Sequence, residues 1–240
     1  MLSVGFIPAS SLDIEDSFFR YDTSFIQTVG ADFNIAGVYN IFTTIDIRET
    51  KAQSIYFDPY RADFTIGMGL NFRDFKFGIT HECNHDVVTG FEFNSYNGWE
   101  GAWMNITLGW SRGYTITDKI SLTPAFFIGY KPYDNLYIKS PTRYYFIQHK
   151  YGNANNSIYG KLNANFDLFD FLNIDLMFQP EFSLAYGKWN SIKGNIRAEG
   201  RFGNIYLGFD WTMQTRLSTT AYAVNEFTIF LSFRGGNYLF

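Results

Sequence analysis

The sequence predicts an all-β fold, a single antiparallel up-and-down barrel that crosses a membrane, and three observations lead to this prediction. Apolar and polar residues alternate over long segments, short and long connections alternate along the chain, and aromatic residues make up 20% of it. The mean hydropathy is nevertheless only −0.13. This mixture is expected of a sheet that meets lipid on one face and water on the other.

Composition narrows the class of protein further. No run of about 18 apolar residues is present, so the chain has no candidate transmembrane helix. The first residues lack the basic and apolar segments of a signal peptide, so we expect a mature chain that forms one domain over 1–240. Net charge is −4 and the 19 Lys and Arg residues are scattered, which does not indicate nucleic-acid binding. The single cysteine, Cys83, has no partner for an intrachain disulfide.

Period-two alternation predicts the strands. Within 33–48 the odd positions are mostly apolar, and within 60–72 the even positions are. The same alternation recurs in 158–168, 196–202, 205–213 and 227–233. These segments exceed the usual strand length of about 5–6 residues. They match the roughly 9–11 residues that a tilted strand needs to cross a bilayer.

The connections predict the strand count and the location. Tight turns are expected near 30–32, 73–74, 117–119, 170–173 and 203–204, and longer polar loops near 49–59, 86–98, 131–156, 187–191 and 216–224. Counting from a first strand at about 2–9 gives about twelve strands, with both termini at the short-turn end. The chain ends on Phe240, which resembles the C-terminal signature of bacterial outer-membrane proteins and implies that location. A soluble β-sandwich or a lipocalin-like barrel is the alternative, since it shows the same alternation with its apolar face turned inward.

One segment carries residues suited to chemistry. Alternate residues of a strand share a face, so Phe75, Phe77 and Ile79 place His81, Cys83 and His85 on the lipid-facing side. Lys76, Gly78, Thr80, Glu82 and Asn84 then face the lumen. The predicted topology puts the three polar residues at the height of the outer leaflet.

The stretch His81-Glu82-Cys83-Asn84, followed by Asn94 to Trp99, resembles the His-x-Ser-Asn motif of the outer-membrane phospholipase A and lipid A deacylase barrels. The resemblance covers about 25 residues and the barrel architecture. It implies a lipid acyl hydrolase in which His81 is the general base, Cys83 the nucleophile, and Asn97 (or Asn94) orients the imidazole. Membrane phospholipid or lipopolysaccharide is the implied substrate.

The sequence departs from this motif because Cys83 stands where the families have serine. A thiolate is a competent nucleophile, so the position allows a cysteine variant, an engineered substitution or a degenerate remnant. In the phospholipase family a calcium ion supports the oxyanion in a homodimer. Asp86 is the carboxylate nearest to that role here.

Other interpretations of these residues remain open. His81, Cys83 and His85 can simply occupy the headgroup zone, or they can bind a soft divalent metal ion through two nitrogens and a thiolate. A non-enzymatic barrel, either a small pore or a structural protein, is the second functional class. The lumenal charges are expected to form a salt-bridged network: Arg20, Asp22, Asp46, Arg48, Arg61, Asp63, Arg197, Glu199, Arg201 and Asp210.

Overall fold

The structure is a computed structural model of the chain. It describes residues 1–14, 23–50, 58–86, 99–132, 134–140, 143–145, 156–216 and 222–235. Side chains are described within 1–7, 25–47, 62–83, 104–132, 156–215 and 225–235. Within these ranges, no helix is long and apolar enough to span a membrane.

The described residues form one antiparallel sheet. Its strands are β1 (Leu2–Ile14), β2 (Thr23–Ile35), β3 (Tyr39–Thr50), β4 (Asp58–Phe72), β5 (Phe75–Asp86), β6 (Trp99–Ser111), β7 (Tyr114–Thr117), β8 (Ile120–Lys131), β9 (Asp134–Ser140), β10 (Arg143–Tyr145), β11 (Ser157–Leu168), β12 (Leu172–Ser183), β13 (Lys188–Phe202), β14 (Ile205–Arg216) and β15 (Tyr222–Phe233).

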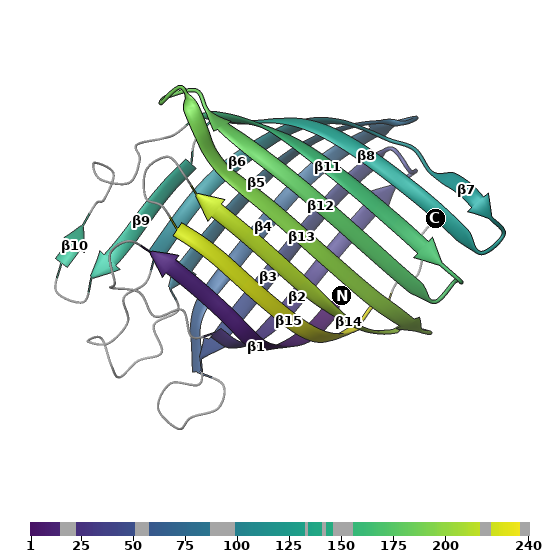
Figure 1. Ribbon diagram of the computed structural model, residues 1–240, viewed down its shortest axis with the longest axis horizontal. Coiled ribbons are helices and arrows are strands. Elements are labelled where there is room, and N and C mark those ends of the chain that lie inside the picture. Colours follow the sequence, from purple (N-terminus) through teal and green to yellow (C-terminus); the bar gives the residue numbers. More distant parts are fainter. Residues whose placement is uncertain are drawn as a thin grey trace.

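Two pairings close this sheet into a barrel (Figure 1). The first strand β1 pairs with the last strand β15, and β6 pairs with β8 over Ile106 to Ser111. Twelve strands therefore form the wall, and the remaining three lie beside it. Strand β7 pairs with the start of β8, β9 pairs with Trp99 to Trp103 at the start of β6, and β10 pairs with β9. The prediction of about twelve antiparallel strands is confirmed.

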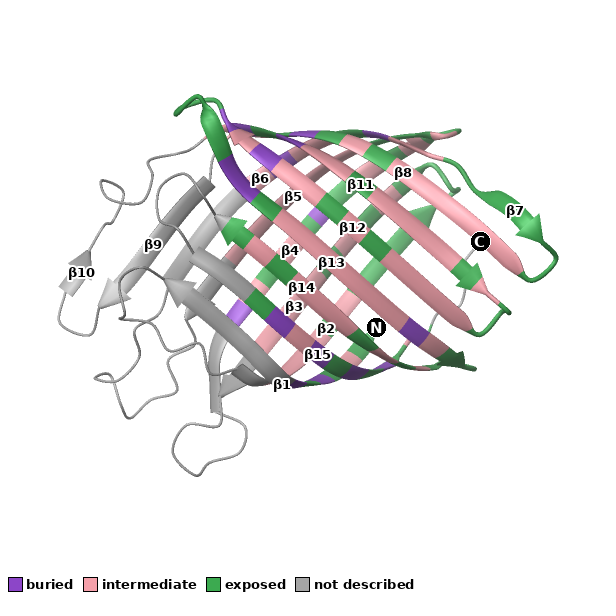
Figure 2. Cartoon of the chain, viewed as in Figure 1, coloured by how far each residue is buried: buried purple, intermediate pink, exposed green. Residues whose placement is uncertain are grey.

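The distribution of apolar residues is inverted relative to a soluble protein. Among the described side chains only four hydrophobic residues are buried, whereas ten polar or charged residues are. Large apolar side chains cover the outside, including Phe33, Met68, Leu108 and Leu231, and exposed positions recur along the strands in Figure 2. A soluble sandwich or lipocalin-like barrel would expose the polar set and bury the apolar one. This alternative is therefore excluded, since only lipid can cover such an outer face.

Both described ends of the chain lie at the short-turn end of the barrel, as predicted. The Met1 ammonium donates to the Gly30 carbonyl at 2.7 Å, and the Arg234 amide donates to the Asn204 carbonyl at 3.0 Å, in the turn between β13 and β14. Exposed aromatic rings surround this end, as expected of an interfacial girdle. They are Phe33, Tyr39, Phe72, Phe75, Tyr114, Phe169, Phe171, Phe202 and Phe233.

The turn predicted at 30–32 is wrong. These residues lie inside β2, and the connection to β3 is Ala36-Gly37-Val38, where Ala36 and Gly37 have φ values of 54° and 70°. Ile35 stands directly opposite Tyr39. A three-residue connection preserves the odd and even faces, so the alternation continued through the turn and concealed it.

Two other boundaries differ from expectation. The first strand extends to Ile14 rather than ending near residue 9. The long loop expected at 187–191 is instead a tight turn at 184–187, closed by the Gly187 amide bonding to the Ser183 carbonyl at 3.0 Å. Gly187 has a φ of 63°, which a glycine adopts without strain, so β13 begins immediately at Lys188.

Candidate functional site

The predicted lipid-facing pair lies on the outer face of β5. His81 stands opposite Ile66 of β4, which is 57% exposed, and Cys83 stands opposite Phe64. Directly opposite residues of an antiparallel pair share a face, so both side chains point outward. Both are half-buried between β4 and β6. Two residues apart on one strand, they are neighbours along the outer surface.

The other residues of the predicted triad cannot be placed. Asn97 and Asn94 lie outside the described residues, as do the side chains of His85, Asn84 and Asp86. No group of three His, Cys, Asp or Glu side chains suited to a metal ion occurs in the described part of the chain. The metal interpretation of His81, Cys83 and His85 therefore stays a prediction.

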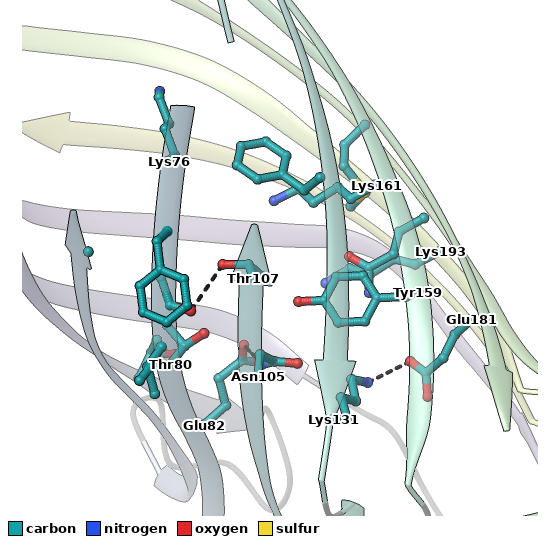
Figure 3. A pocket seen from close by; sticks show the side chains of 18 of the residues that line it. Lys76, Thr80, Glu82, Asn105, Thr107, Lys131, Tyr159, Lys161, Glu181 and Lys193 are labelled. Carbon is teal, nitrogen blue, oxygen red and sulfur yellow. Dashed lines mark hydrogen bonds and ion pairs between the residues drawn. The ribbon is translucent and has the colours of Figure 1, made fainter. Parts of the chain in front are cut away.

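The barrel interior contains a cavity of about 660 Å³ (Figure 3). Its lining begins beside the short turns, at Asn71 and Lys76, and reaches the opposite ends of the strands at Lys131 and Glu181. Lys76, Gly78, Thr80 and Glu82 all line it, which confirms the lumenal face predicted for them. The cavity lies against β3 to β6, β8 and β11 to β14.

One acidic group of the cavity is fully engaged at the long-loop end. The Glu181 carboxylate is 1% exposed and accepts hydrogen bonds from Lys131 Nζ at 2.6 Å, Ser157 Oγ at 2.7 Å and Asn190 Nδ2 at 2.5 Å. This cluster ties together β8, β11, β12 and the start of β13. Three donors compensate the loss of water around the charge.

The second acidic side chain of the cavity, Glu82, lies on the wall formed by β5 and β6. Asn105 Nδ2 donates to Glu82 Oε1 at 2.9 Å. Lys131 also lines the cavity, and its ammonium group is paired with Glu181.

Three further lysines line the cavity and have no such partner. Lys76, Lys161 and Lys193 project from β5, β11 and β13, as Figure 3 shows. Across the described side chains, no carboxylate lies within 4.0 Å of any of their ammonium groups. We call these three residues the lysine row. The sequence analysis did not single out Lys161 or Lys193, although both lie on the polar positions of alternating strands.

Aromatic rings in the lumen cover glycines of the neighbouring strand. Phe42 pairs with Gly67, Phe127 with Gly109, Tyr159 with Gly129, and Phe230 with Gly208. A Cβ at any of these glycines would overlap the ring that covers it. The absence of a side chain thus lets each ring rest on the wall rather than project into the lumen.

A second group of charges lies near the short-turn end, on β13 to β15. Arg234 donates to both oxygens of Glu199 at 2.6 Å, and Arg197 contacts Glu199 at 3.0 Å and Asp210 at 3.7 Å. The two guanidinium groups also lie 4.2 Å and 4.1 Å from the rings of Phe230 and Tyr206. We call Arg197, Glu199, Asp210 and Arg234 the arginine clamp. It contains three of the ten residues predicted to form a salt-bridged network, Arg197, Glu199 and Asp210, and it lies outside the cavity lining. The side chains of four others, Arg20, Asp22, Arg48 and Arg61, lie outside the described residues.

The closed, even-numbered antiparallel barrel with an apolar outer face and a polar lumen defines an outer-membrane β-barrel, and the protein resides in the bacterial outer membrane. Comparison with protein-family models and with curated proteins gives no match.

Similar solved structures are outer-membrane barrels. A KdgM porin has a TM-score of 0.42 at 6% identity, covering 97% of this chain and 99% of that chain. The CymD monoaromatic hydrocarbon channel has a TM-score of 0.46 at 6% identity, covering 98% and 88%. The outer membrane channel DcaP of Acinetobacter baumannii has a TM-score of 0.35 at 10% identity, covering 90% and 69%.

Proposed function

We propose that the protein is a diffusion channel that lets small polar solutes cross the outer membrane. The observation that carries this proposal is the cavity of about 660 Å³, whose lining of mixed polar and apolar side chains extends from the short-turn end toward the opposite end of the strands. Amide, hydroxyl and ammonium groups there offer hydrogen bonds to water and to solutes. The rings of Phe127 and Tyr159 cover glycines of the neighbouring strands, which leaves the cavity between them open.

Two adjacent residues of β6 provide a matched test. Thr107 lines the cavity, whereas Leu108 points to lipid and is 59% exposed. Purified protein should produce discrete conductance steps in a planar lipid bilayer. Thr107→Trp should lower the conductance because the indole fills the lumen, and Leu108→Trp should leave it unchanged because the indole meets lipid. A silent wild-type barrel, or equal effects of the two variants, would contradict the channel.

A second candidate function rests on the outward pair. We propose that His81 and Cys83 hydrolyse the ester bonds that attach acyl chains to phospholipid or lipid A, because a base and a nucleophile are neighbours on the face that meets lipid. In this reaction the thiolate attacks the ester carbonyl, His81 protonates the departing alcohol, and water then releases the fatty acid from the thioester.

Acyl release from phospholipid or lipopolysaccharide micelles tests this candidate. His81→Ala and Cys83→Ala should each abolish release, whereas Ile79→Ala, on the same face of β5, should not. Measurement with and without a calcium chelator, together with the mass of the detergent-solubilised protein, tests the expected calcium and homodimer. Release that neither substitution lowers would refute the hydrolase.

A further inference from the structure

The lysine row gives the cavity an excess of positive charge. Four lysines and two glutamates line the cavity, and one lysine, Lys131, is neutralised by Glu181 at 2.6 Å. In the described structure, Lys76, Lys161 and Lys193 have no carboxylate within ion-pair distance. The nearest printed contact of Lys161 is the ring of Phe127, 5.5 Å from its ammonium group. A ring face accepts a cation without neutralising its charge.

The strand register places these lysines in one row across neighbouring strands. Tyr159 of β11 stands opposite Glu181 of β12. Lys161, two residues further along β11, therefore stands opposite Gln179 of β12. Gln179 in turn stands opposite Lys193 of β13, which stands opposite Gln214 of β14. Lys161 and Lys193 are therefore separated by one strand, about 10 Å between their backbones. Two flexible ammonium groups at this spacing can approach one solute from either side.

Lys76 belongs to the same row on the other side of β8. It stands opposite Gly109, which stands opposite Phe127, and Phe127 stands opposite Lys161. The Phe127 ring covers Gly109 and lies between Lys76 and Lys161, 5.5 Å from the Lys161 ammonium group. The three lysines line the same cavity, together with the amide side chains of Gln179 and Gln214.

We propose that the lysine row is an oxyanion site, and that the channel selects small solutes that carry carboxylate or phosphate groups. The proposal rests on the channel function proposed above and specifies its substrate class. Ammonium groups attract an anion as it enters the lumen, and amide groups donate hydrogen bonds to its oxygens. Within the described structure, Glu82 and Glu181 are held by Asn105 and Lys131, and neither carboxylate lies within ion-pair distance of Lys76, Lys161 or Lys193.

Ion selectivity tests the proposal on the whole protein in planar bilayers. In a potassium chloride gradient, the zero-current potential should show that chloride passes more readily than potassium. The K161Q/K193Q double variant should shift the permeability ratio toward potassium by about fourfold for each charge, because a unit charge roughly 10 Å away in water changes the partitioning of chloride and of potassium about twofold each, in opposite directions. K161R/K193R should retain the wild-type ratio. K188Q is the matched control, since Lys188 is exposed at the start of β13 and outside the cavity.

Uptake into liposomes tests the solute class directly. Succinate should enter faster than its neutral analogue succinamide, and K161Q/K193Q should remove the difference while leaving succinamide uptake unchanged. Absence of any conductance would overturn the channel and the site together. Conductance with no preference for chloride, or equal uptake of the two solutes in wild type, would overturn the oxyanion site alone.

Discussion

Lys193 and Arg197 lie on the same face of the same strand, four residues apart, yet they do opposite things. Arg197 is bound by two carboxylates, Glu199 at 3.0 Å and Asp210 at 3.7 Å, and its guanidinium covers the ring of Phe230. Lys193 faces the cavity between two glutamines and has no carboxylate partner among the described residues. The comparison shows two kinds of charge in the lumen: the arginine clamp is paired across neighbouring strands, whereas the lysine row has no carboxylate within ion-pair distance among the described residues.

Glu181 should show the largest effect on stability, because it is the cavity carboxylate with the most buried partners. Glu181→Ala leaves the Lys131 ammonium, 14% exposed, without its counter-charge. We expect a loss of about 3–5 kcal/mol in the free energy of unfolding, as for other buried pairs broken on one side. Urea unfolding in lipid vesicles measures this loss. Lys131→Met combined with Glu181→Leu should recover part of it, and failure to recover any would show that Ser157 and Asn190 matter more than the charge pair.

Arg234→Met should have the next largest effect on stability and should distinguish the arginine clamp from the lysine row. It removes two hydrogen bonds to Glu199 and the contact with Tyr206, while Arg197 still holds the carboxylate. Because Arg234 is one-third exposed, we expect a loss of about 1–3 kcal/mol in the free energy of unfolding. The chloride preference should stay as in wild type, since the clamp does not line the cavity. A changed preference would mean that the clamp also contributes to the path of the solute.

Gly129→Ala should narrow the cavity. A Cβ at Gly129 would overlap the Tyr159 ring, whereas a Cβ at Gly160, on the neighbouring strand, meets nothing within 4 Å. We expect Gly129→Ala to displace the ring into the lumen, lowering the conductance and costing about 1–2 kcal/mol of stability through overpacking. Gly160→Ala is the matched control and should leave the conductance unchanged. Equal conductance of both variants would show that the ring does not set the width of the lumen.

Arg112→Ala should have the smallest effect. Arg112 lies 3.8 Å from Asp74 outside the lumen, and their side chains are 61% and 41% exposed. A solvent-exposed pair of this kind contributes at most about 1 kcal/mol, and salt screens it. Unfolding at low and high ionic strength should therefore differ only slightly between wild type and this variant. A loss as large as that of Arg234→Met would remove the distinction between the clamp and a surface pair.

Alternation alone was sufficient to predict the barrel, the approximate strand count and the two faces of most strands. It located the turns at 73–74 and 203–204, where the alternation ends in polar residues and glycine. It could not locate the turn at 36–38, because three connecting residues leave the odd and even faces unchanged. For the outward pair, it predicted the side on which His81 and Cys83 lie, while the orienting role of Asn97 stays a prediction.

The sequence by itself determined that this chain has a lipid-facing and a water-facing side, since a period of two residues encodes faces directly. It also assigned Lys76 and Glu82 to the lumen. Only the tertiary structure decided which lumenal charges are paired, because a partner is chosen by cross-strand register and not by sequence distance. Register places Asp210 opposite Arg197, and Arg234, directly after β15, reaches Glu199 of β13 across β14. The same register places glutamines beside Lys193, so its charge stays available in the cavity.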